Sequence, residues 1–359
     1  TKPLAIAIEG SRGHFSVLET RIHGTPEHLE ADAYYVERLV KTLLWQKGGS
    51  TVMICGDRPV FEKIAQTYSP QGARSFDYHF MARVYERPFA VVSLDYAQKP
   101  ASSSQARPVG RHLDGCRIGF DAGGSDRKVS AVIDGEPVFS EEVVWLPKEQ
   151  SDPEYHFNGI VEAFRSAAAH MPRVDAIGIS SAGIYINNRT MVASLFLKVP
   201  DDLFEAKVKD IYIRAAAAIE PDIPVEVCND GDVSALAGAM SFDSDSVLGL
   251  AMGTSEAGGY VDQDGNITGW LNELAFVPVD ASPQAMVDEW SGDIGCGVKY
   301  FSQDGIIKLA PRAGIDLSAA ATPAEKLKIV QKLMAEGDER AAAVYASTGC
   351  YLGHALAWY

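Results

Sequence analysis

Phosphate chemistry is suggested by one short stretch, in which an acid, two glycines and a hydroxyl follow an apolar run: Asp121, Gly123, Gly124 and Ser125. Glycines lack a side chain, so they allow a sharp reversal and a close approach of backbone N–H groups to phosphate oxygens. Asp121 could hold Mg²⁺ through water, and Ser125 could donate a hydrogen bond. Lys128 to Ile133 alternates like a returning strand. The stretch predicts either a metal–phosphate site or a plain β-hairpin.

Two further turns follow apolar strands. Val225 to Cys228 leads into Asn229 and Asp230, and a run of small residues comes next. Val247 to Met252 leads into a second glycine turn, Gly253 to Gly259. Asn and Asp at a strand end are also good helix N-caps, so a structural role is the alternative for Asn229 and Asp230.

Composition narrows the classes of function. The chain has 359 residues, an apolar fraction of 47% and a net charge of −16. A protein that binds a phosphate backbone needs clustered Lys and Arg, and the sequence has no such cluster, so no nucleic acid is expected as a partner. No apolar run reaches the roughly 18 residues of a membrane span, so no membrane is expected either. The five scattered cysteines predict reduced thiols and a cytoplasmic protein.

The first 110 residues are predicted to form a small α/β unit of unknown role. Residues 3–8 and 51–55 are expected strands. Between them, Thr25-Pro26 starts a helix with apolar residues at helical spacing, and Gly48-Gly49 ends it. The Ser- and Pro-rich residues 98–112 predict a linker, with a boundary near residue 110.

In the rest of the chain, the sequence predicts strands that alternate with helices. Three strands joined by tight turns between Cys116 and Trp145 predict an antiparallel ladder. Near the C-terminus, Thr322-Pro323-Ala324-Glu325 is a capping box that starts a helix. The last helix reaches Tyr359 with no cap and no glycine stop. We therefore expect the chain to be truncated at its C-terminus.

The three turns, in this order, resemble the ROK family of sugar kinases and repressors, within the actin-like ATPase superfamily. The resemblance covers roughly residues 116 to 359 and leaves residues 1–110 outside it. The stretches that carry it are DAGGSDRK, AIGISSAG, CNDGDVSALAG, GTSEAGGYV, GWLNELAFVPV and GCGVKYFS. It implies two α/β lobes of the actin-like ATPase (ribonuclease H-like) fold, residues 111–232 and 233–359, preceded by the small α/β unit.

The resemblance also implies roles for single residues. Residues that would face Mg²⁺ or the phosphates are Asp121, Gly123, Gly124, Ser125, Gly253 and Thr254. Residues that would contact the sugar are Asn229, Glu273 and Gly183. Asp230 would be the general base, because a sugar hydroxyl must lose its proton as it attacks the γ-phosphate. Such a base is worth roughly 10²–10⁴ in rate.

The zinc motif of the family is not reproduced. Phe276 stands where the family has His, and Glu289 and Ser291 stand where two zinc cysteines would be. Cys296 is left alone, and structural zinc needs about four ligands, so we expect no zinc.

Two other departures affect the phosphate and sugar contacts. Ser255-Glu256 lies in the second phosphate turn, where a carboxylate would repel a phosphate. Glu256 must therefore point away, meet Mg²⁺ or weaken ATP binding. Val298 replaces a sugar-binding Glu. A substrate other than plain glucose, or none, is expected.

The function expected from the sequence is ATP-dependent phosphorylation of a hydroxyl on a sugar or sugar derivative, with ATP and Mg²⁺ as cofactors. The alternative is a non-catalytic sugar or nucleotide sensor on the same fold. A repressor would need a helix-turn-helix before Cys116, which the strand-containing first region does not resemble. If residues 1–110 have an activity of their own, the only candidate site in the sequence is the loop Glu9 to Arg12. The sequence leaves open whether the protein forms a homodimer.

Overall fold

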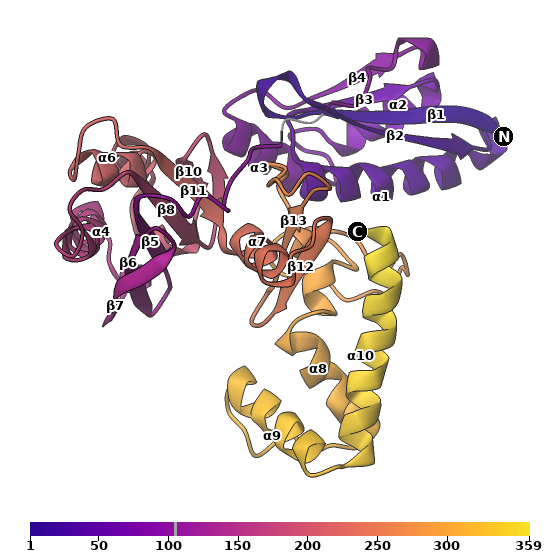
Figure 1. Cartoon of the computed structure of the whole chain (residues 1–359). Helices are drawn as coiled ribbons and strands as arrows, with labels where there is room; N and C mark the ends of the chain where they lie inside the picture. Colours follow the sequence, from indigo (N-terminus) through magenta and orange to yellow (C-terminus); the bar gives the residue numbers. More distant parts are fainter. Residues whose placement is uncertain (104–105) are drawn as a thin grey trace. The chain divides into compact units, whose positions relative to one another are not determined.

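The computed structural model describes residues 1–103 and 106–359, which form two compact units (Figure 1). Unit 1 combines Thr1–Gln105 with Leu250–Gly258 and Trp270–Tyr359. Unit 2 comprises Ala106–Gly249 and Gly259–Gly269. The first region of the sequence therefore packs in the same unit as the C-terminal segment.

The larger sheet of unit 1 has four strands in the order β2 (Phe15–Ile22), β1 (Lys2–Glu9), β3 (Thr51–Cys55) and β4 (Ala90–Leu94). β1 runs antiparallel to β2 and β3, and β3 runs parallel to β4. The continuous apolar run in β1 fits a strand covered on both faces, and its residues 4–8 are fully buried. The strands predicted at residues 3–8 and 51–55 are confirmed, whereas β2 was not predicted.

Three helices accompany this sheet: α1 (Leu29–Lys47), α2 (Arg58–Thr67) and α3 (Ser75–Tyr85). The helix predicted between Thr25-Pro26 and Gly48-Gly49 is confirmed as α1, which a 3₁₀ turn precedes. α1 is buried along most of its length, and both Lys41 and Trp45 are fully buried. A helix this deeply buried needs partners for its charged side chains.

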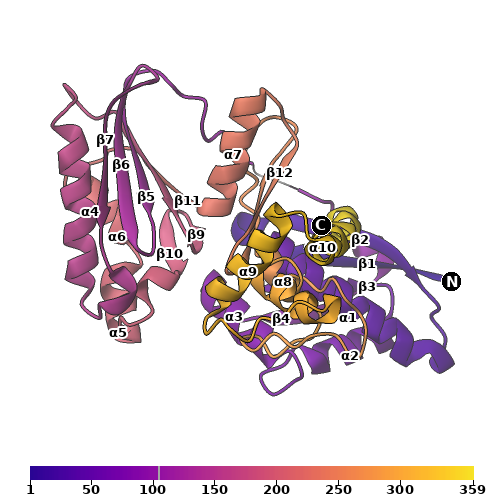
Figure 2. The ribbon, with the colours of Figure 1, turned by 90° about the horizontal axis from the view of Figure 1, so that it is seen from below.

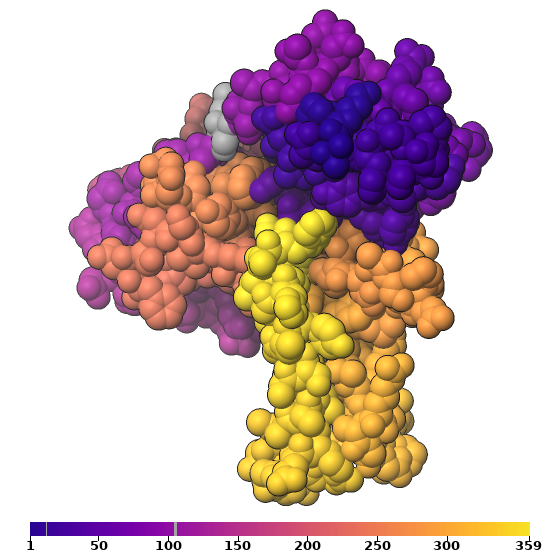
Figure 3. Space-filling view, turned by 90° about the vertical axis from the view of Figure 1, so that its right-hand side faces the viewer, coloured from indigo at the N-terminus to yellow at the C-terminus, as the bar shows by residue number. Residues whose placement is uncertain are grey.

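The C-terminal part of unit 1 is helical. α8 (Gln303–Leu309), α9 (Pro323–Ala335) and α10 (Glu339–Trp358) pack around a small apolar core, and α10 is the yellow column in Figure 3. The capping box at Thr322 is confirmed, because the Thr322 hydroxyl accepts from the Glu325 N–H at 3.2 Å while the Glu325 carboxylate accepts from the Thr322 N–H at 2.9 Å.

Unit 2 is built on a five-stranded sheet in the order β11-β8-β5-β6-β7, of which Figure 2 labels β11, β5, β6 and β7. Its strands, in chain order, are β5 (Cys116–Ala122), β6 (Asp126–Ile133), β7 (Glu136–Val144), β8 (Ala176–Ser181) and β11 (Val225–Asn229). β5, β6 and β7 form the predicted antiparallel ladder, while β8 and β11 run parallel to β5.

The helices α4 (Pro153–Ala168) and α6 (Ile211–Ala217) of unit 2 contribute to one apolar core with this sheet, in which Phe120 of β5 meets Phe164 of α4 edge to face. The remaining elements follow the sheet in chain order or connect its strands. They are β9 (Ile184–Ile186), β10 (Arg189–Val192), α5 (Asp201–Leu203), the π-helical turn η6 (Phe204–Val208) and α7 (Asp230–Phe242). β12 (Val247–Met252) and β13 (Glu256–Val261) then form a two-stranded sheet.

Short 3₁₀ turns link many of these elements. They are η1 (Ser11–Gly13), η2 (Pro26–His28), η3 (Tyr96–Gln98), η4 (Pro147–Glu149), η5 (Ser194–Phe196), η7 (Leu274–Phe276), η8 (Gly297–Lys299) and η9 (Ala310–Ala313). Among the residues that the structure describes, no helix has both the length and the apolar character needed to cross a membrane.

Candidate active site

A cavity of about 480 Å³ opens in unit 2 where β5 and β8 end and α7 begins. Two carboxylates, Asp121 and Asp230, line it together. The other lining residues are Ala122, Gly123, Gly124, Lys148, Ser180, Ala182, Ser194, Leu195, Val233, Ser234 and Ala237. Most of them are small or polar, so the cavity offers backbone groups and hydroxyls beside its apolar surface.

The sheet explains why these residues meet. β5, β8 and β11 are parallel, so their carboxyl ends lie at one edge of the sheet, which is where ligands bind in open α/β folds. Asp121 is paired with Ser180 across β5 and β8, and Asp230 comes directly after β11. The sequence predicted a role for both carboxylates, and the sheet brings them to one cavity.

The turn between β5 and β6 needs Gly123 because backbone approaches it closely, and the end of the Lys148 side chain lies over Gly124. A Cβ on Gly123 would lie 2.5 Å from the Asp126 carbonyl oxygen, and one on Gly124 would lie 2.9 Å from Cε of Lys148. Trp145 holds the turn: its indole N–H donates to the Gly123 carbonyl at 2.8 Å. Two small residues therefore leave the backbone of this turn open at the cavity wall.

Ser125, predicted to face the phosphate, is not among the residues that line the cavity. Its hydroxyl donates to the Asp126 carboxylate at 3.1 Å, and its carbonyl accepts from the Trp145 N–H at 3.1 Å. The contacts of Ser125 thus support the shape of the turn.

Asn229 is the N-cap of α7. Its side-chain oxygen accepts from the Gly231 N–H at 2.8 Å, and its amide N–H donates to the Gly183 carbonyl at 2.7 Å. Gly183 has a φ of +150°, and a Cβ there would lie 2.5 Å from the Val192 carbonyl oxygen. Asn229 therefore joins the loop after β8 to the start of α7, with one amide hydrogen and one lone pair left for a ligand.

Asp230 begins α7 with a carboxylate that is partly shielded from water. Burial raises the pKa of Asp230 above its usual range, and the nearby Asp121 carboxylate raises it further, while the Gly231 N–H opposes both effects. A carboxylate with a raised pKa is a stronger proton acceptor, which is the property that a general base needs.

The second glycine turn lies in unit 1, at the tip of the β12–β13 hairpin. Gly253 and Thr254 are exposed, and the Gly253 carbonyl accepts from the Gln303 N–H at 2.8 Å. Glu256 points into the interior and is 3% exposed, and its carboxylate accepts from the Tyr359 hydroxyl at 2.8 Å. The sequence left three possibilities for Glu256, and the structure shows the first of them: the side chain points away from the glycine turn.

Burial raises the pKa of Glu256 to about 7, although the Tyr359 hydroxyl acts in the opposite direction. The second carboxylate oxygen, Oε2, is buried with no hydrogen-bond partner. A carboxyl group in such a place holds its proton more readily than an exposed one, because nothing compensates a full charge on that oxygen.

Glu273 and Phe276 lie in unit 1, beside the C-terminal end of α1. The Glu273 N–H donates to the Trp45 carbonyl at 3.0 Å, so the segment is tied to the last turn of that helix. The Phe276 ring packs against Trp45 at 4.5 Å and Trp290 at 4.8 Å between centroids. Phe276, in the position of the family's His, is thus part of an aromatic cluster.

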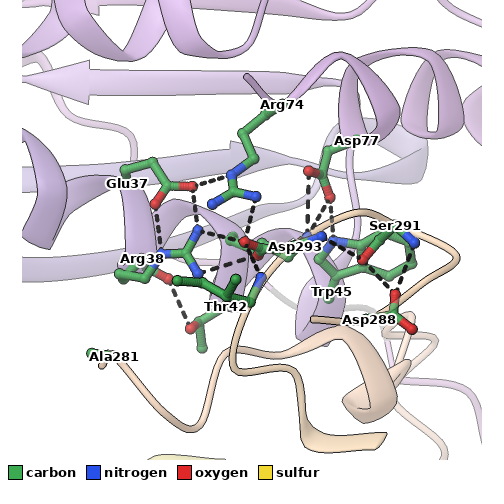
Figure 4. A network of polar contacts seen from close by, with 12 residues as sticks. Glu37, Arg38, Thr42, Trp45, Arg74, Asp77, Ala281, Asp288, Ser291 and Asp293 are labelled. Carbon is green, nitrogen blue, oxygen red and sulfur yellow. Dashed lines mark hydrogen bonds and ion pairs between the residues drawn. The ribbon is translucent and has the colours of Figure 1, made fainter. Parts of the chain in front are cut away.

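An ionic cluster holds the segment that stands in place of the family's zinc cysteines (Figure 4). Asp293 is 2% exposed and contacts Arg38 at 3.2 Å, Lys41 at 3.2 Å and Arg74 at 2.5 Å. The three cations come from α1 and from the start of α3, and they lower the pKa of Asp293 against the effect of burial. The absence of zinc stays a prediction.

The predicted site residues divide between the units. Asp121, Gly123, Gly124 and Asp230 line the cavity of unit 2, with Asn229 and Gly183 bonded to each other beside it. Gly253, Thr254 and Glu273 belong to unit 1. Sequence reasoning missed four polar residues of the cavity wall: Lys148, Ser180, Ser194 and Ser234. Ser180 lies in the AIGISSAG stretch and Ser234 in the CNDGDVSALAG stretch, but no sequence signal marked Lys148 or Ser194.

Comparisons with known proteins agree with this architecture. No protein-family model and no curated protein sequence matched the chain. Among solved structures, a ROK hexokinase from Thermus thermophilus matches with 21% identity and a TM-score of 0.51, over 66% of this chain and 75% of that chain. A ROK family glucokinase from Streptomyces griseus, in complex with glucose and AMPPNP, matches with 20% identity and a TM-score of 0.46, over 67% of this chain and 77% of that chain.

A ROK family transcriptional regulator, a homolog of the E. coli MLC protein, matches with 17% identity and a TM-score of 0.49, over 89% of this chain and 79% of that chain. At these identities the likeness concerns the fold. Together with the sheet of unit 2 and the turns at its edge, the match to the hexokinase confirms the resemblance found in the sequence. The chain therefore has the fold of this ROK hexokinase.

Proposed function

We propose that the protein is an ATP-dependent kinase that phosphorylates a hydroxyl of a sugar or sugar derivative. The observation that carries the proposal is the cavity of unit 2, where Asp121, an open glycine turn and Asp230 meet at the carboxyl ends of parallel strands. The raised pKa of Asp230 adds to it, because a kinase of this type needs a proton acceptor at the attacking hydroxyl.

The residues of the cavity fit Mg²⁺ and a triphosphate. Gly123 and Gly124 keep backbone free of side chains at the wall, which suits phosphate oxygens. Mg²⁺ is usually bound by one or two carboxylates, phosphate oxygens and waters, so Asp121 is a sufficient protein ligand. Bound Mg-ATP would supply the phosphoryl group, with the metal neutralising charge on its oxygens.

The chain's own residues would position the reactants. Asp121 would orient the water ligands of the metal from the end of β5. Asp230 would accept the proton of the attacking hydroxyl. The remaining amide hydrogen and lone pair of Asn229 would hold a neighbouring sugar hydroxyl. Each of these groups belongs to a strand end or a helix start, where the backbone fixes its direction.

The sugar is proposed as a class and not as a single compound. The hexokinase and glucokinase named above act on, or are complexed with, hexoses, which suggests a substrate of similar chemistry. Phe276 packs into an aromatic cluster, and Val298 is apolar. We therefore propose a substrate that differs from glucose at the position where these two residues replace polar ones.

The kinase proposal is tested by turnover of Mg-ATP with a broad sugar panel. Asp230→Asn keeps the shape of the side chain but cannot take a proton, so it should lower kcat by roughly 10²–10⁴ and leave sugar affinity within a few fold. The matched control is Asp222→Asn, an exposed Asp of unit 2 at a φ of +63°, which Asn tolerates. The control should keep wild-type activity.

Two results would count against this proposal. Turnover that survives Asp230→Asn would remove the base assignment, and would favour the N-cap role, since Asn caps as well as Asp. Binding of sugar or nucleotide by the wild-type protein without any turnover would favour the sensor on the same fold.

A further inference from the structure

Lys148 is a cation in the wall of the candidate cavity, and no sequence pattern pointed to it. Its Nζ lies 3.0 Å from the place that a Cβ on Gly124 would occupy, so the side chain lies over the open glycine turn. The same cavity is lined by Asp121 and Asp230, and Lys148 is the only basic residue among its described lining residues. The ammonium group therefore lies beside the surface that phosphate oxygens would meet.

Lys148 has no partner of its own. Across residues 1–103 and 106–359, no hydrogen bond, ion pair or cation–π contact involves its side chain. Three other lysines of unit 2 are paired, among them Lys128 with Asp126 at 3.2 Å and Lys207 with Glu154 at 2.9 Å. An unpaired ammonium over an open glycine turn is suited to an anion.

The backbone that leads into Lys148 is held at two points. Trp145 is 4% exposed, and its indole N–H donates to the carbonyl of Gly123 at 2.8 Å. Two residues later, Nε2 of the fully buried His156 lies 3.0 Å from the Pro147 carbonyl and donates to it. Lys148 directly follows these anchors, so the turn η4 fixes the direction from which its side chain reaches the cavity.

We propose that Lys148 binds the terminal phosphoryl group of a Mg-nucleoside triphosphate. This inference rests on the proposed kinase function. An ammonium group offers three donors and a compact charge, and it would offset the negative charge of Asp121 and Asp230 toward a polyphosphate. The terminal phosphate is the one assigned because the phosphoryl group that is transferred must lie next to the hydroxyl that Asp230 activates.

The test is calorimetric titration of the full chain with Mg-AMPPNP, which has a terminal phosphate, and with Mg-ADP, which lacks it. Lys148→Met should weaken AMPPNP binding at least tenfold and change ADP binding by less than threefold. Lys148→Arg keeps the charge and should restore most of the AMPPNP affinity. The control Lys198→Met removes an exposed lysine of unit 2 that does not line the cavity, and should bind both nucleotides like the wild type.

The outcomes separate this inference from the proposed function. If the wild type prefers AMPPNP and Lys148→Met abolishes the preference, the assignment holds. If Lys148→Met binds AMPPNP as the wild type does, Lys148 is not the ligand, while the kinase proposal stands. If the wild type binds neither nucleotide with any sugar of the panel, the kinase proposal fails and the inference fails with it. Equal melting temperatures of wild type and variants exclude misfolding as the cause of a loss.

Discussion

At the scale of single residues, burial decides what a carboxylate does in this protein. Asp230 directly follows the strand β11, and Glu256 begins the strand β13. Burial raises the pKa of both carboxyl groups. Asp230 lines a cavity, whereas Glu256 is enclosed and bonded to Tyr359. The first is therefore placed for proton transfer and the second for a structural contact.

Glu256 predicts a pH dependence of stability. Its pKa is about 7 in the folded chain and its ordinary value is 4.5. An acid with a raised folded-state pKa stabilises the fold when protonated, so the contribution of Glu256 to stability is largest below pH 4.5, falls as the pH rises toward about 7, and is constant above that. At about 1.4 kcal/mol per pKa unit, the loss is roughly 2–4 kcal/mol. Glu256→Gln cannot ionise and should flatten this part of the curve.

The measurement is urea unfolding of the wild type and Glu256→Gln at several pH values between 4.5 and 8. The relevant quantity is the change in unfolding free energy across that range, because any constant effect of the amide cancels. Glu220→Gln, an exposed residue, serves as the control and should follow the wild type. Parallel curves for wild type and Glu256→Gln would show that Glu256 is not buried as described.

At the scale of elements, the walls of the cavity depend on a histidine outside it. His156 is fully buried on α4, and its Nε2 lies 3.0 Å from the Pro147 carbonyl of η4 and 3.2 Å from the Leu195 carbonyl of η5. One N–H thus joins the two turns that carry Lys148 and Ser194 to the cavity. His156 is a positioning residue for both.

His156→Phe keeps a ring but removes this donor, so the Leu195 carbonyl loses its bond to His156 and the Pro147 carbonyl keeps only the Gln150 N–H, at 3.2 Å. The variant should lose about 1–3 kcal/mol of unfolding free energy and bind Mg-AMPPNP more weakly. His156→Gln keeps a donor and should recover part of the nucleotide affinity, which a loss of packing alone would not allow. Tyr155→Phe removes a hydroxyl that accepts from the Leu146 N–H at 3.2 Å and should have a smaller effect on both readouts. Equal AMPPNP affinity in His156→Phe and wild type would contradict the positioning role.

At the scale of the whole molecule, unit 1 is held together by charges from distant parts of the chain. Asp293 of the C-terminal segment is enclosed by Arg38, Lys41 and Arg74 of the first region (Figure 4). Lys41 also contacts Asp77 at 3.1 Å, and the Trp45 N–H donates to Asp77 at 2.6 Å. The cluster ties the N-terminal helices to the segment that stands in place of the family's zinc motif.

Asp293→Asn should destabilise unit 1 strongly, since it leaves buried cations without their shared counter-charge. Removing one partner of a buried ion pair typically costs about 3–5 kcal/mol. Glu62→Gln breaks an exposed pair with Arg58, both more than half exposed, and should cost less than about 1 kcal/mol. Calorimetric unfolding of both variants measures the difference. A similar small effect for both would mean that the cluster contributes little to stability.

Much of the local structure could be predicted from the sequence, because neighbouring residues determine it. The bounds of β3, the capping box at Thr322 and the antiparallel strands β5 to β7 all depend on apolar spacing, caps and turn residues within a few positions. The glycine turn after Asp121 and the strand end before Asp230 were found in the same way. These signals were sufficient for the fold and for the main carboxylates of the candidate site.

Only the tertiary structure decided which distant groups meet. Arg38 and Asp293 are 255 positions apart, and Tyr359 and Glu256 are 103 apart, so no local pattern connects them. Lys148 follows Trp145 in an unremarkable turn, and it reaches Gly124 because the β5–β6 turn is bonded to Trp145. Contacts of this kind depend on strand order and on how helices pack against the sheet. Spacing along the chain does not encode either one, because side chains from any two segments become neighbours once the sheet is assembled.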